Sequence, residues 1–180
     1  MKTLTDGWIQ TFTGRRFYPL QPRFEDVCLI DIAHALSNIC RFTGHTKTFY
    51  SVAQHSVLVS TLVGSDPLTQ LWALLHDASE AYLCDIAKPV KPLLTGYVEA
   101  EERVMRVIAE KFDLGWPRPE IIHTADMQAL ATERRDLMGP CDVDRSSGQP
   151  PLEWKIERGA LPEEAEQLFL GAARYYAEKL

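Results

Sequence analysis

Apolar residues recur every three or four positions over much of the chain, which is the spacing that predicts amphipathic helices. The predicted helices cover residues 25–44, 51–64, 68–83, 99–112, 118–138 and 162–180. Ser51 is a suitable N-cap for the second of them, and Pro67 suits the first position of the third. The pattern therefore predicts an all-α fold.

The regions between these helices have the composition of irregular structure. Residues 1–28 combine prolines and glycines with aromatic residues and arginines, which indicates an irregular N-terminal segment with a short strand or two. Residues 139–154 are rich in Gly, Ser and Asp and predict a surface loop. Because neither a repeat nor an interdomain linker is evident, we expect one domain over residues 1–180.

The composition of the chain restricts the kinds of partner that we expect it to bind. The formal net charge of -6 argues against binding to a nucleic-acid polymer or an anionic membrane. The chain has neither a signal peptide pattern nor an apolar stretch of about 18 residues, so we expect a cytoplasmic protein outside the membrane. The four cysteines are widely separated in the sequence, which favours reduced thiols over a zinc knuckle.

Four polar residues interrupt apolar stretches of three different predicted helices. His76 and Asp77 follow an apolar run that begins at Leu71, and His55 and Asp126 have apolar neighbours in their own helices. Burying such a group without a partner costs on the order of 2–7 kcal/mol, so each needs a hydrogen-bond partner or a metal ion. Singly, each residue is more often a paired core or surface group. Together they have the composition of a metal site, which usually draws three or four ligands from separate elements.

The order of these residues resembles that of the HD-domain phosphohydrolases, an all-α family of helical bundles. The resemblance covers residues 31–137 and is closest to bacterial 5'-deoxynucleotidases, with phage dATP triphosphohydrolases sharing much of the framework. It is carried by Ser51-Val-Ala-Gln-His-Ser56, His76-Asp-Ala-Ser-Glu80, Asp85-Ile-Ala-Lys-Pro-Val-Lys91 and Asp126. It implies that His55, His76, Asp77 and Asp126 hold one divalent ion, which would be Mn, Co, Zn, Fe, Ni or Mg.

The same resemblance implies catalytic roles for two carboxylates. Glu80 matches a catalytic glutamate, and Asp85 matches an aspartate that orients the attacking water. On one continuous helix Glu80 would share the face of His76 and Asp77 one turn further on. The alternative is that Glu80 is a solvated helix residue and that Asp85 only forms a turn.

Phosphate transfer also requires cations that balance the developing charge. By resemblance Arg41 and Phe42 contact the phosphate and sugar of a nucleotide, and Lys91, Lys88 and His123 are further phosphate-binding candidates. Two residues depart from the family pattern, because His123 stands where lysine is frequent and Phe42 where tryptophan is usual. For Lys88 we favour the alternative of a solvated surface position.

The N-terminal segment has no counterpart in the compact family core. It either lines a nucleotide pocket, with Arg15 or Arg16 on a phosphate and Phe17 or Tyr18 on a base, or closes the bundle, which we favour.

These features predict a metal-dependent phosphohydrolase that acts on small-molecule nucleotides. The first expectation is a 5'-nucleotidase that releases phosphate from deoxynucleoside monophosphates, and the alternative within the family is a triphosphohydrolase. Two alternatives of another class are a non-catalytic, metal-containing nucleotide-binding module and a helical interaction domain without metal. By resemblance alone we also expect a homo-oligomer of two or more subunits.

Overall fold

Seven α-helices form the protein in the computed structural model, which describes residues 7–142 and 148–180. The regular elements of this part of the chain are β1 (Ile9–Gln10), β2 (Arg16–Phe17), η2 (Phe24–Asp26), α1 (Leu29–Asn38), η3 (Arg41–Gly44), α2 (Val52–Leu62), α3 (Pro67–Leu74), α4 (Glu80–Leu83), η4 (Lys91–Leu93), α5 (Tyr97–Lys111), α6 (Glu120–Leu137) and α7 (Pro162–Ala177). The prediction of an all-α single domain with an irregular N-terminal segment is confirmed.

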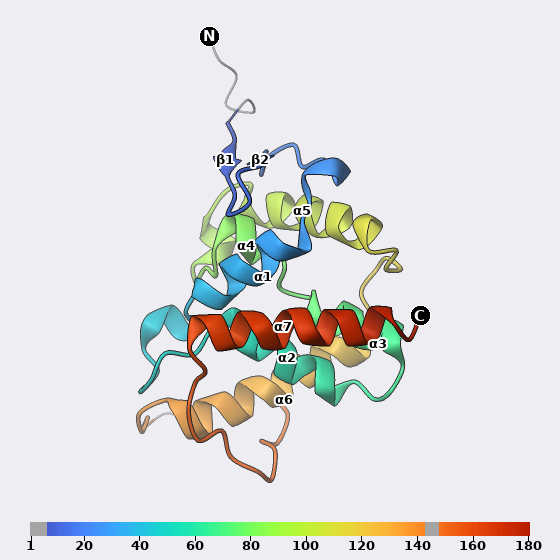
Figure 1. Ribbon diagram of the computed structural model, residues 1–180. Helices are drawn as coiled ribbons and strands as arrows, with labels where there is room; N and C mark the ends of the chain where they lie inside the picture. Colours follow the sequence, from blue (N-terminus) through green and yellow to red (C-terminus); the bar gives the residue numbers. More distant parts are fainter. Residues whose placement is uncertain (1–6, 143–147) are drawn as a thin grey trace.

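Helix α2 lies at the centre of the bundle, where it contacts α1, α3, α6 and α7. The C-terminal helix α7 crosses the front of the molecule over α1, α2 and α3 (Figure 1). It buries Ala165, Phe169 and Ala173 in a core that continues through Leu36 and Leu74. This arrangement leaves the inner face of α2 entirely shielded from solvent.

The ends of several helices follow from local chemistry. The Ser51 hydroxyl accepts a hydrogen bond from the backbone N–H of Gln54, as predicted for an N-cap, and Pro67 occupies the first turn of α3. The first helix ends at Asn38, earlier than the predicted residue 44. Residues 41–44 form the separate turn η3, because Phe42 and Thr43 adopt left-handed backbone angles that an α-helix does not allow.

The prediction of one helix over residues 68–83 is wrong. Helix α3 ends at Leu74, residues 75–79 form a turn, and the short α4 begins at Glu80. In a helix successive side chains diverge by about 100° around the axis. In the turn, hydrogen bonds such as the one from Glu80 N–H to the Asp77 carbonyl tighten the chain, and His76 and Asp77 both face the same interior space.

The described part of the N-terminal segment closes the bundle. The backbone N–H and hydroxyl of Thr13 donate to the two carboxylate oxygens of Asp31 on α1, at 2.7 and 2.9 Å. Phe17 is fully buried and stacks on Tyr82 of α4 with ring centroids 3.6 Å apart. Its ring is therefore not available to stack on a base. The first six residues of this segment lie outside the described residues.

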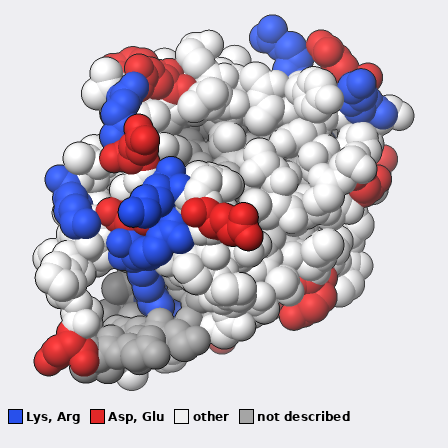
Figure 2. Space-filling view, turned by 90° about the horizontal axis from the view of Figure 1, so that it is seen from below, with Lys and Arg blue, Asp and Glu red and all other residues white. Residues whose placement is uncertain are grey.

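The predicted surface loop 139–154 contains neither helix nor strand in its described part, and residues 143–147 lie outside that part. Arg135 of α6 donates to the carbonyls of Leu152 and Trp154 and so fixes the segment that leads to α7. On the face seen from below, Lys and Arg side chains gather on the left with acidic side chains beside them, and most of the rest of the face is uncharged (Figure 2).

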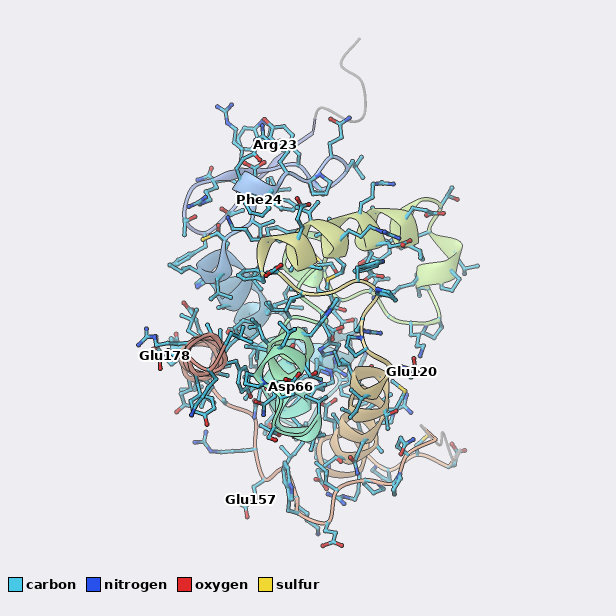
Figure 3. All side chains as sticks on the ribbon, turned by 90° about the vertical axis from the view of Figure 1, so that its right-hand side faces the viewer. Arg23, Phe24, Asp66, Glu120, Glu157 and Glu178 are labelled. Atoms are coloured by element: carbon cyan, nitrogen blue, oxygen red, sulfur yellow. The ribbon has the colours of Figure 1, made fainter. Side chains whose placement is uncertain are left out.

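Charged side chains such as Arg23, Glu157 and Glu178 point outward from the helical body (Figure 3). No described helix is both long enough and apolar enough to cross a membrane.

Candidate metal centre

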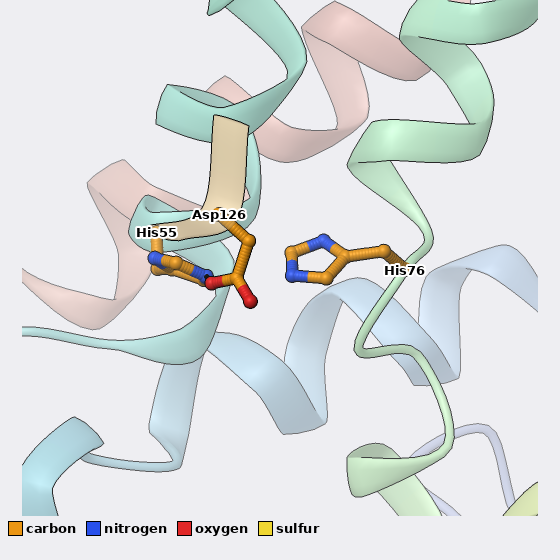
Figure 4. A group of neighbouring side chains, drawn as sticks. All are labelled: His55, His76 and Asp126. Carbon is orange, nitrogen blue, oxygen red and sulfur yellow. Dashed lines mark ion pairs between the residues drawn. The ribbon is translucent and has the colours of Figure 1, made fainter. Parts of the chain in front are cut away.

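The four predicted metal ligands converge from three parts of the chain. His55 comes from α2, His76 and Asp77 from the turn after α3, and Asp126 from α6. One ligand atom each of His55, His76 and Asp126 lies within 4.8 Å of the others, and the three side chains point toward one another (Figure 4). The Asp77 Oδ2 atom lies 3.1 Å from His76 Nε2 and 3.7 Å from His55 Nε2.

Each imidazole uses its Nδ1 atom for a hydrogen bond that turns Nε2 toward this cluster. His76 Nδ1 lies 2.7 Å from the Ala73 carbonyl, and His55 Nδ1 lies 2.7 Å from Glu133 Oε1. A carbonyl can only accept, so the His76 proton is on Nδ1, and its Nε2 presents a lone pair. Both Nε2 atoms are buried and have no hydrogen-bond partner. Two orphaned imidazole nitrogens beside two carboxylates are a donor set that fits a divalent metal ion.

The electrostatics of the metal-free cluster show how strongly it favours positive charge. Burial lowers the pKa of His55, but the carboxylates of Glu133 and Asp126 outweigh this effect and raise it to about 9. Burial raises the pKa of Asp126, but the close contact and charge of His55, whose Nε2 atom lies 3.2 Å from Asp126 Oδ1, bring it down to about 2. The pKa of Asp77 is driven well below its usual range by His76, His55 and Arg41 against the effect of burial.

Glu133 is the functional residue that sequence reasoning missed. It is fully buried on α6 and accepts from His55 Nδ1 at Oε1 and from Arg41 Nε at Oε2, the latter at 3.1 Å. Its position seven residues after Asp126 was the available indication, because residues two helical turns apart share one face.

Arg41 reaches the cluster from the turn η3. Its side chain is 11% exposed, and its guanidinium lies 3.7 Å from Asp77 Oδ2 in addition to its bond with Glu133. The next two residues, Phe42 and Thr43, have positive φ angles of 54° and 55°. Such angles cost non-glycine residues about 1–3 kcal/mol each and concentrate at functional sites. The Phe42 ring packs 5.5 Å from the Arg41 guanidinium carbon.

The two predicted catalytic carboxylates lie beside the cluster. Glu80 is buried at the start of α4, and its Oε2 atom has no hydrogen-bond partner. Burial, with the nearby charges of Asp77 and Asp85, raises the pKa of Glu80 to about 9 in the metal-free protein. Burial also raises the pKa of the partly buried Asp85, and Asp77 adds to that shift.

The other three predicted phosphate-binding residues are less well placed than Arg41 to contact a phosphate at the cluster. Lys91 Nζ lies 2.8 Å from Glu101 and 3.6 Å from Glu80, and within the described residues no ion pair links it to the four candidate ligands. Lys88 and His123 are exposed, and among the described residues no hydrogen bond or ion pair links either of them to the cluster. Sequence spacing did not reveal this because each side chain's direction depends on the surrounding fold.

The fold and the cluster together define an all-α protein with two imidazoles and two carboxylates gathered in its interior. No family model matches the chain. It is 47% identical over 147 residues to the uncharacterized protein YfdR of Escherichia coli, a match that covers 82% of this chain and 79% of YfdR. It is 36% identical over 158 residues to an uncharacterized protein of Rhodobacter capsulatus, covering 80% and 81% of the two chains. The chain belongs to the family of these proteins.

Proposed function

We propose that the protein is a metal-dependent phosphohydrolase of the HD-domain class that acts on nucleotides, with a deoxynucleoside 5'-monophosphate as its substrate. The observation that carries the proposal is the pair of buried, partnerless Nε2 atoms of His55 and His76 beside the carboxylates of Asp77 and Asp126. Leaving such nitrogens unpaired in a protein interior is unfavourable, and a bound cation removes the penalty.

His55, His76, Asp77 and Asp126 would hold the ion. Mixed nitrogen and oxygen donors suit Mn, Co, Zn, Fe or Ni better than Ca. When bound, such an ion supplies a Lewis acid for the phosphoryl oxygens and lowers the pKa of water.

The remaining side chains supply the other requirements of phosphate ester hydrolysis. Arg41 is a fixed cation at the edge of the cluster and balances negative charge on the phosphoryl group. Glu80 is buried at the start of α4 beside the charges of Asp77 and Asp85, and in the metal-loaded protein it would give a proton to the leaving oxygen. Asp85 lies close enough to interact with Glu80 and would orient the attacking water.

The order His55, His76-Asp77, Asp126 supports membership of the HD-domain class over a non-catalytic nucleotide-binding module. A sensor that keeps the ion for structure has no need of a buried carboxyl oxygen without a hydrogen-bond partner, such as Glu80 Oε2. A helical interaction domain without metal has no need of the two partnerless imidazole nitrogens.

The test is a substrate screen with the purified protein loaded with Mn²⁺, Co²⁺ or Zn²⁺. Nucleoside mono-, di- and triphosphates are supplied, and released phosphate, pyrophosphate and triphosphate are measured separately. We expect metal-dependent release of phosphate from deoxynucleoside monophosphates and its loss in Asp77→Ala. Release of triphosphate would instead assign a triphosphohydrolase. Metal binding without release of any product would favour the binding module, and full activity in Asp77→Ala would overturn the ligand set.

A further inference from the structure

Glu133 connects two side chains that the proposed function uses for different purposes. Its Oε1 atom accepts from Nδ1 of His55, a metal ligand, at 2.7 Å. Its Oε2 atom accepts from Nε of Arg41, the phosphate-binding candidate, at 3.1 Å. The Tyr50 hydroxyl is a third partner of the same carboxylate. None of the other described carboxylates contacts both a candidate ligand and a candidate substrate residue through separate oxygens.

The surroundings of Glu133 hold it in one place. Glu133 and His55 are fully buried, and the Arg41 side chain is 11% exposed. The Arg41 guanidinium and the His55 imidazole each lie within hydrogen-bond distance of a different oxygen of Glu133, so a negative charge on this carboxylate is balanced from two sides. A buried carboxylate with three partners is costly to disturb, because removing any partner leaves charge uncompensated. Helix α6 also carries Asp126, so one rigid element supplies a ligand and the group that orients another.

We propose that Glu133 is a positioning residue that orients His55 toward the metal and holds Arg41 for phosphate, so that both binding events depend on one carboxylate. This inference rests on the proposed function, since it requires a metal at His55. Glu133 acts through His55 and Arg41 and touches neither the metal nor the substrate.

Glu133 affects metal binding through His55. A carboxylate at Nδ1 fixes the proton on that nitrogen, orients the ring and increases the donor strength of Nε2. Loss of such a partner typically lowers metal affinity about 10–100-fold.

Glu133 affects phosphate binding through Arg41. Without the charge of Glu133, the nearest carboxylate left to Arg41 is Asp77, which lies 3.7 Å away. Arg41 would then pair with Asp77, where it competes with the metal and is withdrawn from phosphate. Replacing Arg41 in the same protein removes that competition.

The test measures binding of Co²⁺ by its visible absorption and binding of inorganic phosphate to the loaded protein by calorimetry. We expect Glu133→Gln to weaken Co²⁺ binding about 10–100-fold and to weaken phosphate binding as well. The double variant Glu133→Gln, Arg41→Met should regain part of the Co²⁺ affinity and none of the phosphate affinity. Glu166→Gln is the matched control, because Glu166 makes the same kind of bond to Nδ1 of His34, at 3.0 Å on the α1–α7 contact. It should bind Co²⁺ like the wild type.

The outcomes separate the two proposals. A wild-type protein that fails to bind Co²⁺ would overturn the proposed function. A wild type that binds Co²⁺, with Glu133→Gln equal to Glu166→Gln, would overturn the role of Glu133 alone. If Glu133→Gln does not fold, Glu133→Asp is measured in its place and should also weaken Co²⁺ binding, because its shorter side chain cannot reach both partners; nitrogen NMR of the Zn²⁺-loaded wild type must in addition show the His55 proton on Nδ1, the atom that faces Glu133. A proton on Nε2 would contradict the proposal.

Discussion

At the scale of single residues, the site depends on which nitrogen of each imidazole is left free. His76 is fixed by a backbone carbonyl and His55 by the buried Glu133, and these two bonds aim both Nε2 atoms at one point. Asp77 and Asp126 complete the charge at that point. The two imidazoles face the cluster because the partners of their Nδ1 atoms hold the rings in place.

Removing one ligand should abolish stabilisation by metal. The wild type is expected to gain about 2.7 kcal/mol of unfolding free energy when Co²⁺ is present at 100 times its dissociation constant. His76→Ala removes one of the two imidazole donors and should lose most of this gain. Thermal unfolding of the wild type and of His76→Ala, each with and without Co²⁺, measures the stabilisation of both proteins. Equal stabilisation of the two proteins would exclude His76 from the ligand set.

At the scale of elements, the break between α3 and α4 and the anchoring of α6 decide the geometry of the site. The turn at residues 75–79 brings His76 and Asp77 inward together, and α6 supplies both Asp126 and Glu133. The C-terminal end of α6 is tied to the following segment by Asp136, which accepts from Arg135 and from the backbone N–H of Ile156.

The anchor at Asp136 should make stability depend on pH in acid. The hydrogen bond from Arg135, against a small effect of burial, lowers the pKa of Asp136 below its ordinary value of 3.8. A carboxylate with a depressed folded-state pKa stabilises the fold fully above its unfolded pKa and loses this effect as the pH falls through the folded value. Asp136→Asn should therefore unfold at a lower temperature than the wild type near pH 7, with the difference shrinking below about pH 3.8. Melting curves across this range test it.

Glu157→Gln, which removes an outward-pointing charge in the same segment, is the control for that experiment. It should melt close to the wild type near pH 7. A deficit of Asp136→Asn that stays constant down to the acid end of the range would contradict the ionic origin of the effect.

At the scale of the whole molecule, α7 joins elements that are distant in the sequence. It packs on α1, α2 and α3, and on α2 the Ser60 hydroxyl lies 2.9 Å from the Tyr176 hydroxyl of α7. The rigidity of His55 therefore depends in part on a helix more than 100 residues further along the chain.

Truncation in the α7 interface should reduce stability without disrupting the group of His55, His76 and Asp126. Phe169 is fully buried, and Phe169→Ala is expected to lower the unfolding free energy by about 3–5 kcal/mol through lost burial and the cavity left behind. The neighbouring Leu168 is 53% exposed, so Leu168→Ala should change it by no more than about 0.5 kcal/mol. Denaturant unfolding compares the two, and equal effects would contradict the packing described for α7.

Much of the fold could be predicted from the sequence, because helix formation depends on residues that lie close together in the chain. The spacing of apolar residues, the Ser51 cap and Pro67 placed most helices within a few residues of their bounds. The break after Leu74 escaped this reasoning, since Leu75 and Ala78 continue the helical spacing of apolar residues across the turn. Glu133 escaped it too, because a glutamate on a helix is usually solvated, and its partners lie 78 and 92 positions away in the sequence.

The sequence by itself determined the all-α class, the helix caps and the set of residues with ligand chemistry, because these depend on residue type and short-range spacing. The tertiary structure decided which of those residues meet. It placed His55, His76, Asp77 and Asp126 together, paired Lys91 with carboxylates, left Lys88 and His123 at the surface and put Glu133 between His55 and Arg41. The physical reason is that the direction and partners of a side chain are fixed by packing between distant segments, which local periodicity does not encode.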